Sequence, residues 1–553
     1  MNSALLEFPR QAPSTDTDEA PQVYMQGRID NGVDVLQAYQ RFGLEFPKHL
    51  LGDFAIVIHD SARQRVIAVR DQLGVQPFYY HLGSQRLLCA QSEGELLAHP
   101  DVTRAINEAV VAETLDNTTT TLTETLYRDI QRLPPGQLLV VTPDSHQFHI
   151  YWELPLYEPW SRATPEQSQD EFNDLLQQAV AARISGVEHI GANLSGGLDS
   201  TVVAAAAQQW LDQHRPGTKL KTYSLLIDSA WTEPEAPRIQ SMLNHYPFDA
   251  TLKRFTQAPE LDWAANAKRN HSLPDHPIFT THDLYLDPLR EHKTQVLLTG
   301  EGGDDWFSGD DYLFATLWSR PAQAVNELRY QASDSWLDGV KLLAGSLGWP
   351  LLPGAMRRHQ FEKRARPGYS PFLGHALMRR TGLEERYKEI GACGQSRSLA
   401  RSTRAYQLHP ASLAERFEMA HMHGANRGYE LRFPLSDRRL VEFALRTPPG
   451  QLRRGPCNKL LLRGSGLLPE NVARSPAKGD FSAAIQSALN QPVVRDTLNN
   501  LRIAELGWAD QRAVTEALQK MDRGAPQAGI LRLLRCLWLV FAVEIWYTCY
   551  IRE

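Results

Sequence analysis

I-G-A-N-L-S-G-G-L-D-S, residues 190–200, is the stretch that decides the predicted fold. Its apolar start, Ile190–Leu194, predicts a buried strand, and a helix is expected to begin near Thr201. Strand and helix patterns then alternate along the chain, which predicts a parallel sheet in an α/β domain. The other elements expected are strands at Leu220–Ile227, Ala250–Phe255 and Gln295–Thr299, a helix at Glu233–Leu243, and a helix that opens with a capping box at Thr164.

The loop inside this stretch carries the residues of an anion site. Gly196 and Gly197 remove side chains where a backbone must approach a ligand closely, and Ser195 and Ser200 add hydroxyl donors. Backbone amides between a strand and a helix bind anions. Asp199 repels phosphate unless Mg²⁺ lies between the two groups. The loop therefore indicates a site for pyrophosphate and a metal ion, and it matches neither the Walker motif nor G-x-G-x-x-G.

A second glycine loop follows another apolar strand in V-L-L-T-G-E-G-G-D-D-W-F-S-G, Val296–Gly309. Ligands of parallel sheets bind beyond the carboxyl ends of the strands, so both loops are expected at one edge of the sheet. Asp199 and Asp304 would then lie at neighbouring strand ends, where two carboxylates can share Mg²⁺ bound to ATP phosphates. An acidic surface turn is the alternative interpretation.

Composition excludes several classes of protein. The formal net charge is −6, so nothing global indicates nucleic acid or an anionic membrane as a partner. The five cysteines are scattered without a C-x-x-C pair, which predicts a reducing, cytoplasmic location. The most apolar run, Cys536–Val543, is eight residues long and predicts a buried helix. A membrane span would need about 20 apolar residues.

Strand patterns dominate the first part of the chain. Residues 1–20 are expected to form a mobile polar arm, followed by a helix at Val33–Tyr39 and strands at Leu50–Asp60 and Arg65–Asp71. More strands are expected around a Gly83-Ser84 turn and after a Pro-Pro-Gly turn. We divide the chain into a β-rich domain (1–155), a linker (156–164) and an α/β domain with a mostly helical C-terminal part (165–553).

A third set of motifs completes an ordered pattern. Arg427–Pro448 contains E-L-R-F-P-L-S-D, and it is followed by N-K-L-L-L-R (Asn458–Arg463), L-P-E and R-S-P-A-K-G-D-F-S (Arg474–Ser482). The N-terminal part contains, in order, L-L-G-D-F-A, A-V-R-D-Q-L-G-V-Q-P-F-Y-Y, L-P-P-G-Q and Y-W. With the two glycine loops, these motifs resemble those of the asparagine synthetases. Enzymes of this ATP-pyrophosphatase type split ATP to AMP and pyrophosphate and adenylate a carboxylate.

The resemblance implies that residues 1–155 form an Ntn-type glutaminase sandwich. In that family, a cysteine at the mature N-terminus hydrolyses glutamine. Here residue 2 is Asn and no cysteine precedes Cys89. Without this nucleophile no thioester can form, so we expect a degenerate domain that also lacks the family's opening strands.

The resemblance also implies roles for individual residues. Asp304, with Asp199, would bind the metal, Glu301 would assist the attack of the amine, and Lys478 would stabilise negative charge on the phosphates of the adenylate in the transition state. Leu225 would contact adenine through its backbone, and the expected cofactors are ATP and Mg²⁺. The full set of residues expected to bind ATP or pyrophosphate is Asn193, Leu194, Ser195, Gly196, Gly197, Asp199, Ser200, Leu225, Thr299 and Gly300.

Trp306–Arg320 and the stretch to about Ala420 resemble lasso-peptide macrolactam cyclases more than asparagine synthetases. Such cyclases adenylate an Asp or Glu side chain of a precursor peptide, and the N-terminal amine of the peptide then closes the ring. The partners implied are the precursor peptide and a leader peptidase or leader-recognition protein, without nucleic acid or membrane. The helical insert 313–420 is the candidate surface for holding the peptide.

Other functions remain open at this stage. One alternative is a small-molecule amide ligase, either an asparagine synthetase that uses free ammonia or a β-lactam-forming relative. A second is a non-catalytic scaffold, which the intact Asp199, Asp304 and Lys478 disfavour. A third is a tRNA-modifying pyrophosphatase, whose best support would be the basic run Arg357–Arg366, although such runs are usually solvated helix faces.

Overall fold

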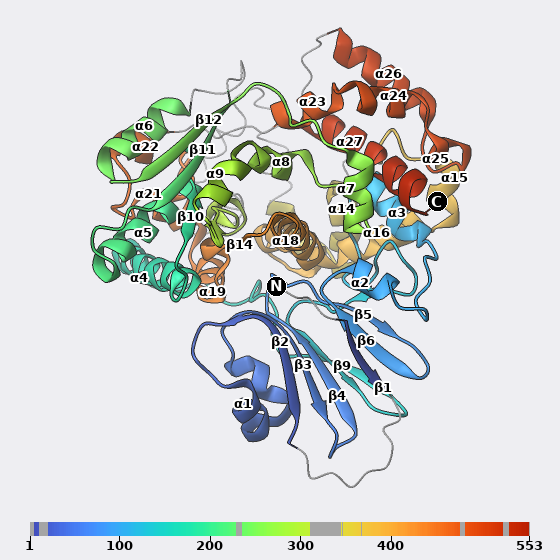
Figure 1. Cartoon of the computed structure of the whole chain (residues 1–553), viewed down its shortest axis with the longest axis horizontal. Helices are drawn as coiled ribbons and strands as arrows, with labels where there is room; N and C mark the ends of the chain where they lie inside the picture. The colour runs from blue at the N-terminus through green and yellow to red at the C-terminus, as the bar shows by residue number, and fades with distance from the viewer. Residues whose placement is uncertain are drawn as a thin grey trace.

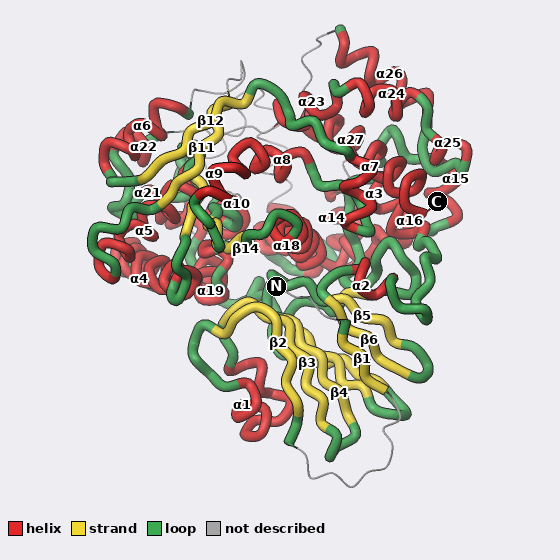
Figure 2. Tube along the Cα trace, in the orientation of Figure 1, coloured by secondary structure: helices red, strands yellow, loops and turns green. Residues whose placement is uncertain are grey.

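The computed structural model describes residues 5–9, 20–227, 235–309, 344, 347–365, 368–475, 482–523 and 530–551. Figure 1 shows a β-rich N-terminal part, a separate sheet flanked by helices and a helical part that contains the C-terminal end of the chain. Figure 2 shows the same division by secondary structure. The α/β class predicted from the sequence is confirmed, including the β-rich N-terminal domain.

Two antiparallel sheets form the N-terminal domain. One has the order β2-β3-β4-β8-β9 and the other β1-β6-β5-β7. Side chains of β3 alternate, with Ala55 and Val57 packed toward the second sheet and Ile56 and Ile58 packed toward α1. The strands are β1 (Leu6–Pro9), β2 (Gln22–Ile29), β3 (Gly52–Asp60), β4 (Arg65–Arg70), β5 (Tyr79–Leu82), β6 (Arg86–Ala90), β7 (Gln131–Arg132), β8 (Gln137–Val141) and β9 (His146–Ile150), with helices α1 (Val35–Phe42), α2 (Glu93–Leu97) and α3 (Glu108–Leu115).

Strand β1 corrects the expectation of a polar arm over residues 1–20. Leu6–Pro9 pair antiparallel with β6, and Phe8 is buried between the sheets because the short strand presents one apolar face. Residues 1–4 and 10–19 lie outside the described part. Strand β2, at the edge of the larger sheet, was not predicted either, since Q-V-Y-M-Q-G-R-I has no regular alternation.

A five-stranded parallel sheet confirms the predicted βαβ arrangement. Its order is β12-β11-β10-β13-β14, so β10 and β13, which carry the two glycine loops, are neighbours. The capping box at Thr164 is present, because Gln167 N donates to Thr164 Oγ1 (3.3 Å) and Thr164 N donates to Gln167 Oε1 (2.9 Å). The strands are β10 (Ile190–Asn193), β11 (Lys221–Ile227), β12 (Asp249–Phe255), β13 (Val296–Leu298) and β14 (Glu430–Arg432), with helices α4 (Pro165–Ile184), α5 (Leu198–His214), α6 (Ala236–His245) and α19 (Arg438–Arg446).

Further helices surround these sheets. The short ones are α7 (Trp263–Asn270), α8 (Pro277–Thr280), α9 (Leu286–Glu291), α10 (Gly303–Phe307), α15 (His375–Arg380), α20 (Pro449–Leu452), α21 (Leu460–Arg463), α22 (Glu470–Ala473) and α25 (Arg502–Glu505). The others are α14 (Gly354–Ala365), α16 (Leu383–Gly391), α17 (Leu399–Gln407), α18 (Pro410–Ala425), α23 (Ser482–Leu489), α24 (Pro492–Asn499), α26 (Gln511–Asp522) and α27 (Ile530–Trp546). Helix α18 runs through the centre of the molecule, beside the N-terminal domain (Figure 1).

Helix α27 confirms the buried helix predicted at Cys536–Val543. Leu534, Leu537 and Phe541 are almost wholly buried in a cluster that includes Trp263 of α7. Within the described ranges, Leu531–Ile551 is the one helical segment long and apolar enough to cross a membrane, and 67% of its apolar window is buried inside the protein. Its packing is that of a core helix.

Candidate active site

The loop after β10 is held by its own hydroxyl groups. Ser195 Oγ and Ser200 Oγ lie 2.7 Å apart, Ser195 N donates to Ser200 Oγ (3.1 Å) and Gly197 N donates to Ser195 Oγ (3.2 Å). Gly196 has φ +73°, a conformation that favours glycine, and its carbonyl accepts from Arg238 Nε at 2.8 Å. Helix α5 begins at Leu198, earlier than predicted, so the loop is shorter than expected.

The loop after β13 packs directly on the first turn of α5. A Cβ on Gly300 would lie 2.4 Å from Ser200 N, and one on Gly303 would lie 2.2 Å from Asp199 Cγ. These contacts explain the glycines, because any side chain there would separate the two loops. The prediction that Asp199 and Asp304 belong to neighbouring strand ends therefore agrees with the sheet order.

Lys459 connects the two acidic loops and was not singled out from the sequence. Its Nζ lies 2.5 Å from Asp199 Oδ2 and 2.8 Å from Asp304 Oδ1. Burial lowers the pKa of Lys459, but the carboxylates of Asp199 and Asp304 outweigh this effect and raise it. The residue precedes α21 with φ +54°, and N-K-L-L-L-R was the signal that could have identified it.

Asp199 and Asp304 also form a donor set suited to a divalent cation. Their oxygens converge on one point, which the Lys459 ammonium marks in this structure. No group of three or more His, Cys, Asp or Glu side chains that could hold a metal occurs among the residues the structure describes. Two carboxylates completed by phosphate oxygens and water match Mg²⁺ coordination at nucleotide sites. The residues present therefore fit Mg²⁺ bound together with ATP.

Glu301 lies beside Asp199 and Asp304. Its side chain is exposed to solvent, but protein atoms surround it closely. Loss of hydration there raises the pKa of Glu301, and the nearby carboxylates of Asp305, Asp199 and Asp304 raise it further, against the effect of Arg416. The Arg416 Nη2 lies 2.8 Å from Asp305 Oδ1, which brings helix α18 to the edge of the site. A carboxylate with a raised pKa is a better proton acceptor near neutrality.

Arg463 connects the segment that contains Lys459 to the motif that begins at Arg474. Its Nε donates to Asn458 O (2.6 Å), and its Nη1 donates to Ala473 O (2.6 Å) and Ser475 O (2.8 Å). Ser475 is the last described residue before residues 476–481. The predicted catalytic Lys478 lies outside the described residues, so its role stays a prediction.

The remaining predicted nucleotide residues lie on or just after strands β10, β11 and β13. Asn193 ends β10, where its Oδ1 accepts from Tyr285 Oη at 3.2 Å. Leu194 is fully buried and its N donates to Tyr223 O of β11 at 2.9 Å. Thr299 follows β13, and Leu225 lies on β11, two strands away from β13 in the sheet. Their contact with a nucleotide stays a prediction.

Two other reactive side chains, Cys89 and His423, are buried. Cys89, on β6, is 2% exposed, and burial raises the pKa of its thiol, so it is no thiolate nucleophile. His423 is fully buried on α18 with Nδ1 3.3 Å from Asp275 Oδ2. The basic run Arg357–Arg366 begins on α14, where Arg357 donates to Leu352 O. In the stretch Trp306–Arg320, residues 310–320 lie outside the described part.

Comparison with known proteins gives the family. Residues 171–548 match the family model described as "Asparagine synthase", and residues 20–152 match the one described as "Glutamine amidotransferase domain". The chain therefore belongs to the asparagine synthase family, whose chemistry is ATP-dependent amide formation.

Three curated relatives illustrate the range of the family. The "Amidase chyE" of Penicillium rubens is 24% identical, over 90% of this chain and 80% of its own. The "Amidase chry2" of Gibberella zeae is 26% identical, over 52% of this chain and 44% of its own. The "Putative asparagine synthetase [glutamine-hydrolyzing] 2" of Methanocaldococcus jannaschii is 26% identical, over 50% of this chain and 53% of its own. The matches to the last two thus span about half of those proteins.

Proposed function

We propose that this protein uses ATP to join a side-chain carboxylate of a precursor peptide to the N-terminal amine of the same peptide. The carboxylate attacks the α-phosphate of ATP, which gives an acyl adenylate and releases pyrophosphate. The amine then attacks the acyl carbon, loses a proton and displaces AMP. The observation that carries the adenylating half is the convergence of Asp199, Asp304 and Lys459 beside the Ser195–Ser200 loop, at the ends of adjacent parallel strands.

The residues of the site have complementary tasks in this reaction. The amides and hydroxyls of the Ser195–Ser200 loop can bind the phosphates, and Lys459 offsets their negative charge. Asp199 and Asp304 would hold Mg²⁺, which when bound supplies further charge neutralisation. Glu301, whose pKa is raised, would accept the proton that the attacking amine must lose.

The peptide branch of the proposal rests on the source of the amine. Cys89, the cysteine of the described N-terminal domain, has a buried thiol, so this side chain is unsuited to releasing ammonia from glutamine. An amine carried by the substrate itself avoids that need. The resemblance of Trp306–Arg320 to macrolactam cyclases supports the same branch. The proposed partners are a precursor peptide and a leader peptidase or leader-recognition protein, in the cytoplasm.

Asparagine formation from free ammonia, or another small-molecule amide or β-lactam synthesis, is the second candidate. Relatives named asparagine synthetase and the presence of Glu301 favour it. The two candidates share the adenylating half and differ in the amine and in the size of the acyl group. The site residues close to ATP therefore do not distinguish them.

A product assay separates the candidates. The protein is supplied with ATP and Mg²⁺ and either aspartate plus ammonia or a leaderless candidate precursor peptide, and products are weighed by mass spectrometry. The proposal predicts a peptide lighter by one water, about 18 Da, together with AMP and pyrophosphate. Asparagine as the product would contradict the peptide branch and support the second candidate.

A further inference from the structure

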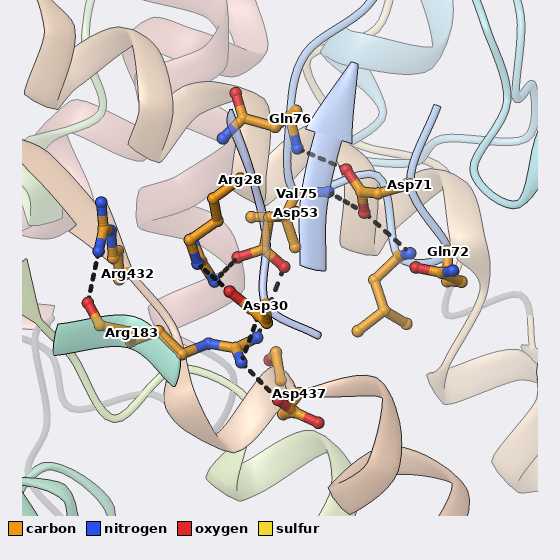
Figure 3. A network of polar contacts seen from close by, with 12 residues as sticks. Arg28, Asp30, Asp53, Asp71, Gln72, Val75, Gln76, Arg183, Arg432 and Asp437 are labelled. Carbon is orange, nitrogen blue, oxygen red and sulfur yellow. Dashed lines mark hydrogen bonds and ion pairs between the residues drawn. The ribbon is translucent and has the colours of Figure 1, made fainter. Parts of the chain in front are cut away.

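Buried ion pairs join the N-terminal domain to helix α4 of the α/β domain (Figure 3). Within the N-terminal domain, Arg28 Nε lies 2.9 Å from Asp30 Oδ1, and Arg28 Nη2 pairs with Asp53. Arg183, near the end of α4, reaches the same two carboxylates, with Nη1 3.4 Å from Asp30 Oδ2 and Nη2 3.5 Å from Asp53 Oδ1. The side chains of Asp30, Asp53 and Arg183 are at most 6% exposed, so water screens these pairs little.

Arg183 also holds the segment that follows β14. Its Nη1 pairs with Asp437, whose side chain is completely buried, and its backbone oxygen accepts from Arg432 Nη1 at 2.5 Å. Asp437 in turn accepts from Arg439 N (2.9 Å) and so caps the first turn of α19. The Arg183 guanidinium thus lies between the carboxylates of Asp30 and Asp53 and the carboxylate of Asp437, which is next to the candidate active site.

The segment 432–437 contacts the loop after β13, which carries Glu301, at several points. Thr299 N donates to Arg432 O at 3.1 Å. Ser436 Oγ accepts from Trp306 Nε1 at 3.3 Å and donates to the backbone oxygen of Glu301 at 3.4 Å. A Cβ on Gly302 would lie 2.4 Å from Ser436 Oγ, which shows how closely the two segments approach. Any shift of Asp437 would therefore be passed to the backbone that carries Glu301.

We propose that Arg183 is a positioning residue through which Asp30 and Asp53 of the N-terminal domain hold the Glu301 loop in place. This positioning role would give the N-terminal domain a function that does not depend on glutamine hydrolysis. The physical cause is that two anchored carboxylates fix the direction of the guanidinium, which then orients Asp437. The effect on amide formation rests on the proposed function, whereas the effect on the order of the loop does not.

The test uses the full chain with Asp30→Asn or Asp53→Asn, each of which removes one carboxylate without changing side-chain size. Hydrogen exchange followed by mass spectrometry compares peptides covering residues 296–307 with peptides from α27. We expect exchange in the loop to become about tenfold faster and exchange in α27 to stay unchanged. Glu108→Gln is a control at a more exposed contact, because the Glu108–Arg380 pair (2.7 Å) also joins the N-terminal domain to a helix, α15, and its described partners lie outside segment 432–437.

A kinetic readout distinguishes positioning from general support. Asp53→Asn should lower kcat for amide formation about tenfold while KM for ATP stays within about twofold. Arg183→Lys, which keeps the charge, should lose less activity than Arg183→Met. Unchanged loop exchange in both aspartate variants, or equal acceleration in α27, would overturn the inference. If wild-type protein forms no amide but the loop still loosens, the proposed function fails and the positioning role stands.

Discussion

Replacing Lys459 with methionine tests the electrostatic centre of the site. The change keeps the length of the side chain but removes the ammonium that lies 2.5 Å from Asp199 and 2.8 Å from Asp304. Removing one partner of a fully buried ion pair costs about 3–5 kcal/mol. Here the Asp304 side chain is 48% exposed, so solvent reduces the loss, and we expect about 2–3 kcal/mol.

The assay is thermal unfolding with and without millimolar Mg²⁺. We expect Lys459→Met to lower Tm by about 2–4 °C in the absence of Mg²⁺. Mg²⁺ should raise the Tm of this variant more than that of wild type, because two adjacent carboxylates without the ammonium attract a divalent cation. ATP turnover should fall by about 100-fold or more. Lys459→Arg, which retains a positive charge, is the control and should be less affected in Tm.

The prediction would be refuted by a Lys459→Met protein with wild-type Tm and wild-type turnover. Either result alone would be informative. Normal stability with lost turnover would mean that the ion pairs stabilise little and that the ammonium acts on the phosphates. Normal turnover with lost stability would assign Lys459 a purely structural role.

Three further predictions concern catalysis and pH. Glu301→Gln should lower amide formation about 100-fold while pyrophosphate exchange into ATP continues, and loss of both would contradict its assignment to the amine step. Asp199→Ala and Lys478→Ala should each abolish turnover with unchanged circular dichroism, and appreciable activity in either would contradict the site. Burial raises the pKa of Glu93 to about 7, against Arg132, so this group stabilises the fold below its unfolded pKa near 4.5 and loses that contribution as pH rises through about 7. Glu93→Gln should therefore raise stability at pH 8, by at most about 3 kcal/mol, and leave it unchanged at pH 4; equal unfolding curves at pH 8 would contradict this.

Local patterns in the sequence were sufficient to predict four strands of the parallel sheet and its two glycine loops. Ile190–Leu194 and Gln295–Thr299 are mainly apolar runs followed by glycine-containing loops, and the rules of parallel sheets bring their ends together. Strands β1 and β14 were harder to predict because each has only a few residues and is stabilised by its partner strand. Their existence depends on tertiary pairing, which no local pattern encodes.

The parts of the site that were missed are long-range contacts between charged residues. Lys459 stands 260 residues after Asp199, and nothing near it in the chain shows that its ammonium would lie between two carboxylates. The same is true of Arg183, whose partners come from three distant segments. The N-K-L-L-L-R motif showed that Lys459 belongs to an ordered series of family motifs. Only the fold shows which groups the Lys459 ammonium contacts.

The most direct test of ATP-dependent carboxylate activation follows an isotope label. A substrate that supports turnover is labelled with ¹⁸O in its carboxylate, and nucleotide and phosphate products are analysed by mass spectrometry. Attack of the carboxylate on the α-phosphate predicts one ¹⁸O in AMP for each amide formed, with unlabelled pyrophosphate. Label in inorganic phosphate, together with ADP, would contradict adenylation at the Ser195–Ser200 loop.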